Sequence, residues 1–151
     1  MTAPFLPKQV EPNFKVKKAR RKINGRKVTD KEFLKEQATI LHSMVVRARA
    51  GYRCERCGKT SGQMQCAHIF SRRYATTRTD EANAWCLCAS CHRYLTENPF
   101  EHCEFGARTR GVEGFQQLKL KAYAGIGKKL AVEFWQAEVD RLTASLKEYG
   151  L

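Results

Sequence analysis

Two pairs of cysteines constrain the fold of this chain more than any other feature of its sequence. Cys54 and Cys57 are separated by two residues, and Cys88 and Cys91 repeat that spacing. A C-x-x-C loop turns the backbone so that two thiolates converge on one ion, and two such loops complete a tetrahedral site. We therefore predict that these four cysteines bind one structural zinc ion, which requires the two segments to meet in the folded protein.

The cysteine count and the length of the chain limit the alternatives. Seven cysteines, an odd number, in 151 residues without an apolar leader favour metal binding in a reducing compartment over disulfide bonds. We expect a cytoplasmic protein of one domain that does not enter a membrane. Isolated cysteines often pack as small hydrophobic residues. This role suits the three cysteines outside the pairs, Cys66, Cys86 and Cys103.

Positive charge is concentrated near the N-terminus. The formal net charge is +13, and residues 1–31 hold ten basic and two acidic residues, a net +8. Three of the four prolines also lie here, so we expect residues 1–28 to form a flexible basic arm. One interpretation is a solvated tail without function. We favour contact with nucleic acid, because closely spaced cations release its counterions. The cations best placed for it are Lys15, Lys17, Lys18, Arg20, Arg21 and Lys22.

A helix is predicted to begin at Thr29. Thr29 and Glu32 match the capping pattern of a helix start, and apolar residues then recur every three or four positions up to Gly51. Packing explains His42 in this helix, so we assign it no function. Helical periodicity returns after a connection that contains several glycines. We predict one α+β domain over residues 29–151, with a helix at 29–51, a zinc-bound core at 52–98 and C-terminal helices at 112–149.

The segment between the cysteine pairs is longer than a simple zinc ribbon needs. It has 30 residues between Cys57 and Cys88, whereas about 15 to 20 residues usually separate the pairs. Polar residues suited to chemistry lie within this segment and just after it. His68 ends a β-prone stretch, Asn83 comes fifteen residues later, and His92 directly follows the second pair. Such a core buries little by itself, so we expect the N- and C-terminal helices to wrap it.

These residues resemble the HNH endonucleases, which have the ββα-metal fold. The similarity rests on "AHI" at 67–69, on the asparagine at 83 with a cysteine five residues later, and on "CASCH" at 88–92. It covers residues 52–98 and is greatest to the small HNH proteins of bacteriophages and prophages. The resemblance implies a zinc-stabilised ββα core and a place in the cytoplasm of a bacterial host, near the nucleoid.

The resemblance also implies a role for each polar residue. His68 matches the general base that activates water. Asn83 matches the residue that orients this base or binds the catalytic cation through its carbonyl. His92 matches a ligand of that cation, which is Mg²⁺, Mn²⁺ or another divalent ion, and the products carry a 5′-phosphate and a 3′-hydroxyl. The alternative for His92 is that it replaces a cysteine at the structural zinc.

One position departs from the family pattern. Many HNH enzymes carry an aspartate before the base, where it binds the cation, and this chain has Ala67 there. Asn83, His92 and a substrate phosphate could still hold one ion, weakly without DNA. The softer ions Mn²⁺, Co²⁺ and Ni²⁺ suit an imidazole ligand better than Mg²⁺ does. Asp80 or Glu81 could instead supply a carboxylate from the loop.

Cations and one aromatic residue follow the predicted base, namely Arg72, Arg73, Tyr74 and Arg78. A solvated loop explains them, but we favour a phosphate clamp in which Tyr74 stacks or packs against the sugar. We therefore predict a metal-dependent endonuclease that acts on double-stranded or branched DNA, in recombination, DNA packaging or defence. The alternative is a zinc-containing DNA-binding or assembly factor with an inactive HNH site. Trp85 is predicted to lie in the core.

Overall fold

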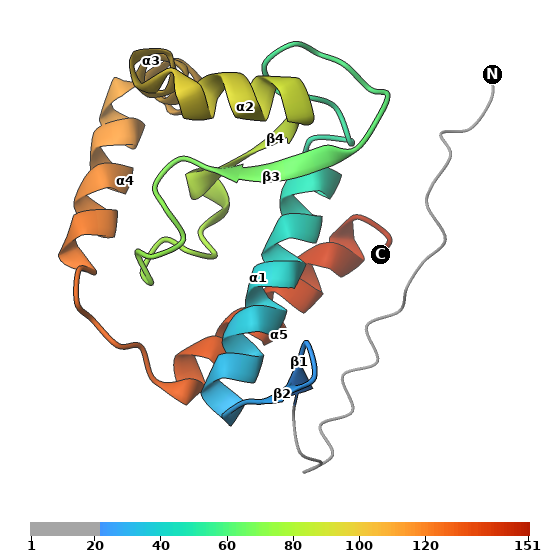
Figure 1. Cartoon of the computed structure of the whole chain (residues 1–151), viewed down its shortest axis with the longest axis vertical. Coiled ribbons are helices and arrows are strands. Elements are labelled where there is room, and N and C mark those ends of the chain that lie inside the picture. Colours follow the sequence, from blue (N-terminus) through green and yellow to red (C-terminus); the bar gives the residue numbers. More distant parts are fainter. Residues whose placement is uncertain (1–21) are drawn as a thin grey trace.

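The structure, a computed structural model, describes residues 22–151 (Figure 1). Over this part of the chain the fold is α+β, with five α-helices and two antiparallel sheets of two strands each. None of these helices has the length and apolar composition to cross a bilayer. The elements in chain order are β1 (Lys22–Ile23), β2 (Arg26–Lys27), α1 (Asp30–Arg49), β3 (Met64–His68), the 3₁₀ turn η1 (Glu81–Asn83), β4 (Ala84–Cys88), α2 (Ala89–Glu97), α3 (Pro99–Arg110), α4 (Val112–Ala124) and α5 (Val132–Glu148).

A short hairpin precedes the first helix, within the segment that we predicted as a flexible arm. Strands β1 and β2 are antiparallel and joined by Asn24 and Gly25, whose φ values are 48° and 78°. A type I′ hairpin turn requires positive φ at both central positions, and Asn-Gly adopts these values readily. Residues 22–27 therefore form a hairpin that includes Lys22. The other predicted contacts of the arm, Lys15, Lys17, Lys18, Arg20 and Arg21, lie outside the described residues.

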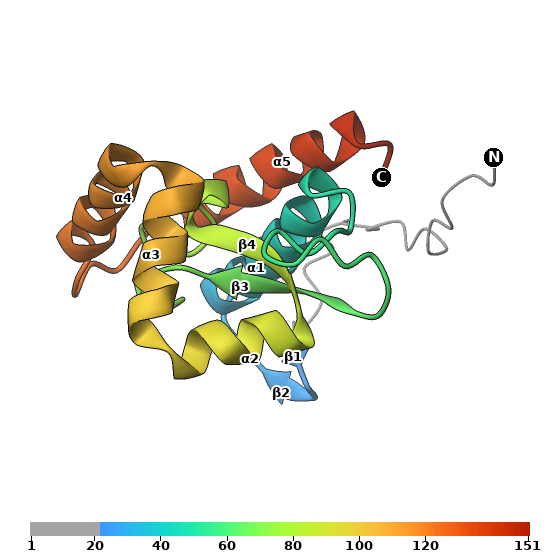
Figure 2. The same cartoon turned by 90° about the horizontal axis from the view of Figure 1, so that it is seen from above.

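Helix α1 forms where the capping pattern predicts it. The Glu32 N–H donates to the Thr29 hydroxyl (3.2 Å), and the Thr29 N–H donates to the Glu32 carboxylate (2.8 Å). These bonds satisfy backbone donors that a helix start leaves free. One face of α1 packs against α5, which lies beside it in Figures 1 and 2. Leu41, Trp135 and Leu142 are almost completely buried there and belong to one of two apolar clusters.

Strands β3 and β4 form the hairpin at the centre of the second cluster. Their register pairs Cys66 with Cys86 and Ala67 with Trp85. Neighbouring residues of a strand point to opposite faces. Cys66 faces His42 of α1, and Trp85 faces α3, where its indole N–H donates to a threonine hydroxyl. Trp85 is 0 % exposed, which confirms its predicted place in the core. Figure 2 shows α2 and α5 on opposite sides of this hairpin.

A helix occupies residues for which we predicted only a connection. Helix α3 begins with Pro99, whose fixed φ suits the first helical turn. A side chain at Gly106 would collide with the ring of Phe115 on α4. This glycine therefore allows close packing of α3 against α4 and does not end the helix. The helix ends instead at Gly111, which has a φ of 73°.

Candidate metal centre and the residues around it

The four paired cysteines meet in the structure, as predicted. Their sulfur atoms all lie within 4.8 Å of one another. Two thiolates bound to one tetrahedral zinc at about 2.3 Å are about 3.8 Å apart, and the Sγ atoms of Cys57 and Cys88 are 3.8 Å apart. Cys54, Cys88 and Cys91 are buried, whereas Cys57 is exposed. The cluster could therefore hold a metal ion such as zinc without a change of fold.

Local backbone structure presents these sulfur atoms. Gly58 has a φ of 74°, and its N–H donates to the Cys54 carbonyl (2.8 Å), which closes the first loop. Cys88 is the N-cap of α2, and Cys91 lies in the first turn of that helix. Hydrogen bonds with the Ser90 hydroxyl and with the Cys91 backbone lower the pKa of the Cys88 thiol, which favours the thiolate that zinc requires.

His92 lies beside this cluster and outside it. Its Nδ1 is 2.7 Å from Oε1 of Gln65 on β3. An amide oxygen only accepts, so Nδ1 carries the proton of the neutral ring and Nε2 keeps a lone pair. Burial lowers the pKa of this imidazole. A bond from one ring nitrogen to the protein is the arrangement found for histidines that bind a metal through the other nitrogen. The structure thus separates His92 from the four thiols that could hold the structural ion.

His68 ends β3 with its ring directed toward α1. Its Nε2 is 2.9 Å from the carbonyl oxygen of Arg78, and its ring centroid is 5.3 Å from that of His42. The carbonyl accepts, so Nε2 is protonated and Nδ1 has the lone pair. Burial lowers the pKa of His68, and the bond to Arg78 partly opposes this effect. The ring is therefore neutral near pH 7 and able to accept a proton.

Asn83 is completely buried and bonds within the loop that joins the two strands. Its Oδ1 accepts the Phe70 N–H (2.8 Å), and its Nδ2 donates to the carbonyls of Phe70 and Thr77 (2.9 Å each). These bonds close the loop over residues 70–83, which contains the Arg78 carbonyl that holds His68. The Asn83 side chain thus holds the loop whose Arg78 carbonyl contacts His68.

The hairpin separates the two predicted site histidines. Gln65 and Cys66 are neighbours on β3 and point to opposite faces. Gln65 contacts His92 on α2, while Cys66 and His68 lie on the face toward His42 of α1. Ala67 shares the face of Gln65 and is 2 % exposed. The position of the family aspartate therefore lies on the side of His92.

Asp80 and Glu81, the two acidic residues considered as cation ligands, are not directed toward Ala67 and His92. Asp80 caps the 3₁₀ turn by accepting the Ala82 N–H (3.0 Å), and it pairs with Lys121 of α4. Glu81 pairs with Arg141 of α5 at 3.0 Å. Both carboxylates thus fasten the loop to the C-terminal helices.

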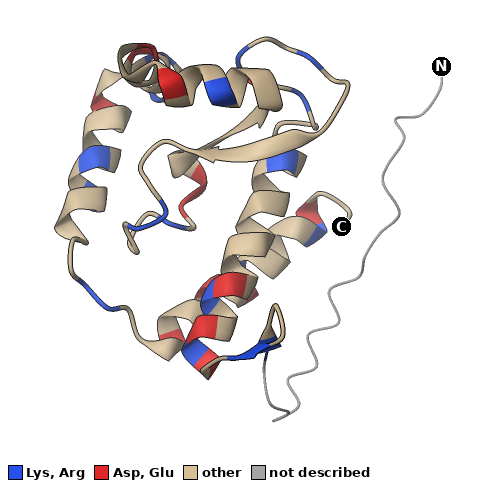
Figure 3. Ribbon diagram, in the orientation of Figure 1, with Lys and Arg blue, Asp and Glu red and all other residues tan. Residues whose placement is uncertain are grey.

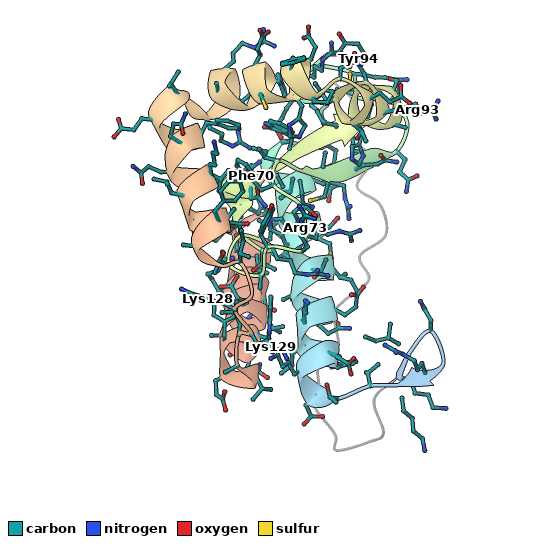
Figure 4. All side chains as sticks on the ribbon, turned by 60° about the vertical axis from the view of Figure 1, so that its left-hand side comes forward. Phe70, Arg73, Arg93, Tyr94, Lys128 and Lys129 are labelled. Carbon is teal, nitrogen blue, oxygen red and sulfur yellow. The ribbon has the colours of Figure 1, made fainter. Side chains whose placement is uncertain are left out.

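The predicted clamp divides into anchored and exposed cations. Arg78 donates to the Thr39 hydroxyl (2.8 Å) and to the Arg72 carbonyl (3.1 Å), so it anchors the loop on α1. Arg72 and Arg73 are exposed, and the Arg73 guanidinium lies 5.2 Å from the centroid of the Tyr74 ring. Figure 3 shows this basic loop between β3 and β4, and Figure 4 labels Arg73 on it.

An aromatic group missed in the sequence extends this surface. The Tyr74 ring lies 5.7 Å from that of Tyr123 on α4, and Lys119 lies 5.8 Å from the Tyr123 centroid. Phe70, labelled in Figure 4, lies 6.3 Å from Tyr123. Because Tyr123 is about fifty residues from Tyr74 in sequence, only the packing of α4 against the loop brings them together.

Three further residues have surroundings that the sequence pattern did not indicate. His42, to which we gave no function, lies with Cys66 and His68 in a second cluster of metal-ligand type. His102 on α3 packs edge-on against Trp85, with ring centroids 5.1 Å apart. Cys103, predicted as a small buried hydrophobe, is exposed on α3. Each lies on a helix, and the sequence pattern did not fix which side of that helix faces the core.

Compared with models of protein families, with curated protein sequences and with solved structures, the chain matches none of them.

Proposed function

We propose that this protein is a metal-dependent DNA endonuclease with an HNH-type site. The proposal rests on one arrangement: strand, loop, strand and helix follow one another, with His68 at the end of β3, Asn83 before β4 and His92 in the first turn of α2. The cysteine cluster fixes α2 to the loop at residues 54–59 and so keeps the helix beside the hairpin. This order and spacing support the roles that the resemblance implies.

The chain supplies a base for hydrolysis. Nδ1 of His68 would take a proton from water, and the resulting hydroxide would attack the phosphorus. The bond from phosphorus to the 3′-oxygen would break, and that oxygen would take up a proton from solvent to give the 3′-hydroxyl. The Arg78 carbonyl fixes the tautomer of His68, and the Asn83 amide holds the loop that carries this carbonyl. His92 offers Nε2 to a divalent cation such as Mg²⁺ or Mn²⁺, which would neutralise charge on the phosphate.

The exposed loop supplies a DNA-binding surface. Arg72 and Arg73 belong to none of the salt bridges found within residues 22–151, so they are available to phosphates. The rings of Tyr74 and Tyr123 offer apolar surface beside these cations. Cations contact the DNA backbone without reading its sequence, so we expect binding with little sequence preference.

A zinc-containing DNA-binding or assembly factor is the second candidate, and two observations favour it. Ala67 places no carboxylate beside His92, and the hairpin directs His68 away from His92. A site of this kind could bind DNA through Arg72 and Arg73 without hydrolysing it.

Cleavage assays separate the two candidates. The purified full chain is incubated with supercoiled plasmid, linear duplex, single-stranded and branched DNA in Mg²⁺, Mn²⁺, Co²⁺ or Ni²⁺. We expect nicking or cutting of at least one substrate that stops when the divalent ion is omitted. DNA binding without cleavage in all four ions contradicts the endonuclease and supports the binding factor.

The basic arm is predicted to strengthen DNA binding through charge alone. Removal of residues 1–21 deletes five closely spaced cations, and each lost phosphate contact lowers the slope of log affinity against log salt by about 0.9. Affinity should fall almost equally for unrelated duplexes, while zinc content stays the same. Fluorescence anisotropy over a range of salt concentrations measures the slope. An unchanged slope means that the arm does not contact DNA.

Ala67→Asp is predicted to create a carboxylate that depends on a cation. Ala67 is buried on the side of His92, and an unpaired buried charge costs on the order of several kcal/mol. Without added Mg²⁺ the variant should melt at a lower temperature than the wild type, and Mg²⁺ or Mn²⁺ should restore part of the loss. Ala38→Asp is the control, because Ala38 is equally buried but lies in the apolar cluster between α1 and α5, away from both groups of metal-ligand side chains. Equal rescue of both variants contradicts a cation site beside His92.

A further inference from the structure

A second group of metal-ligand side chains lies on the face of the hairpin opposite His92. His42 of α1 and Cys66 and His68 of β3 each present one ligand atom, and these three atoms lie within 4.8 Å of one another. Nδ1 of His42 is 3.9 Å from Sγ of Cys66. His42 is completely buried, and Cys66 and His68 are half-buried. The cluster shares no residue with the four paired cysteines.

Backbone carbonyls fix both imidazoles of this group. Nε2 of His42 is 3.1 Å from the Asp80 carbonyl, and Nε2 of His68 is 2.9 Å from the Arg78 carbonyl. Because a carbonyl only accepts, each neutral ring carries its proton on Nε2 and its lone pair on Nδ1. Metal-binding histidines almost always donate their second ring N–H to a carbonyl or carboxylate in this way.

The same loop holds both carbonyls. Asp80 and Arg78 lie in the segment that the buried Asn83 amide closes, and the Arg78 side chain fastens this segment to Thr39 of α1. Orientation of the two rings is therefore built into the fold. Nδ1 of His42 faces the Cys66 thiol, and His68 brings one ring nitrogen within 4.8 Å of both ligand atoms.

We propose that His42, Cys66 and His68 bind a divalent transition-metal ion of the zinc class. Bond lengths of about 2.0–2.1 Å to nitrogen and about 2.3 Å to sulfur place a nitrogen and a sulfur ligand about 3.6 Å apart on one tetrahedral ion. The observed 3.9 Å between His42 and Cys66 approaches this value. A thiolate with two imidazoles selects zinc-class ions over Mg²⁺. Three protein ligands leave a fourth position for water.

This site does not rest on the proposed endonuclease activity. The two proposals meet only at His68, whose Nδ1 has one lone pair. An ion on that nitrogen and its action as a general base therefore exclude each other in the same molecule. If the endonuclease proposal also holds, excess Zn²⁺ lowers the rate of Mg²⁺-dependent cleavage, and Cys66→Ala relieves the inhibition.

Metal analysis of the full chain tests the site without DNA. After reconstitution with Zn²⁺ and removal of free ion, we expect two zinc ions per wild-type chain and one per chain of Cys66→Ala or His42→Gln. Cys86→Ala is the matched control, because Cys86 pairs with Cys66 across the hairpin but belongs to neither cluster. It should keep two ions. One ion in the wild type overturns the proposal, as does an equal metal content in wild type and Cys66→Ala.

Titration of the metal-free wild type with Co²⁺ gives a readout that needs no variant. The two sites differ in sulfur, with four thiolates in one and a single thiolate in the other. We expect a second equivalent of Co²⁺ to add thiolate-to-cobalt absorption of roughly one quarter of that added by the first. Saturation after one equivalent overturns the proposal. A chain that binds two ions yet cleaves no DNA supports this site and contradicts only the endonuclease.

Discussion

Cys54→Ser is expected to remove the structural zinc and cooperative unfolding together. No helix or strand covers residues 50–63 of the described chain, so this segment is fixed through its two cysteines, a few backbone bonds and the side chains of Glu55 and Arg56. A structural zinc contributes about 10–16 kcal/mol in small zinc-binding peptides, and this energy is folding energy. Loss of one thiolate should therefore release the loop from α2. Metal analysis measures the zinc, and circular dichroism during heating measures the transition.

Cys103→Ser is the matched control for this prediction. It makes the same chemical change at an exposed cysteine on α3 that belongs to neither cluster. It should keep wild-type zinc content and a wild-type melting temperature. His92→Ala should also keep the zinc of the four cysteines, because His92 bonds to Gln65 instead. Wild-type zinc content and melting in Cys54→Ser contradict the assignment of the four-thiolate site.

His68→Ala is expected to lower the rate of plasmid nicking by about 10² to 10⁴-fold, the usual contribution of a general base. DNA affinity should stay close to that of the wild type, because His68 is half-buried under the loop while Arg72 and Arg73 remain exposed. The zinc of the four cysteines should remain as well. Single-turnover nicking of supercoiled plasmid measures the rate, and anisotropy measures the affinity.

Cys66→Ala distinguishes two roles for His68, that of a general base and that of a metal ligand. If His68 acts as a base, Cys66→Ala keeps the nicking activity in Mg²⁺ that His68→Ala loses. Loss of activity in both variants shows that an ion in the second cluster is needed for cleavage, which contradicts the base. Equal nicking by wild type and His68→Ala indicates a contaminating nuclease or another base, and the proposed role of His68 is then wrong.

The sequence by itself predicted the features that depend on neighbouring residues. Thr29 and Glu32 place the start of α1 because a capping box forms within one turn. The two C-x-x-C loops required residues 54–57 and 88–91 to meet, since a metal-binding pair is incomplete alone. The apolar surroundings of Trp85 indicated a core position. Helix α3 was not predicted because a glycine at position 106 suggests a helix break. In the structure, the Phe115 ring packs against Gly106 and leaves no room for a side chain there.

Only the tertiary structure decided where the histidines point. A shift of one residue in the β3–β4 register would exchange the two faces of the hairpin and with them the surroundings of His68 and Cys66. His42 is 24 residues from Cys66 in sequence, so their contact depends on the rotation and the docking of α1. Packing between elements that are distant in sequence sets the direction of these side chains. A periodic pattern of apolar residues within one element gives no information on that packing. For this reason the sequence identified the paired cysteines, and the fold alone brought His42, Cys66 and His68 together.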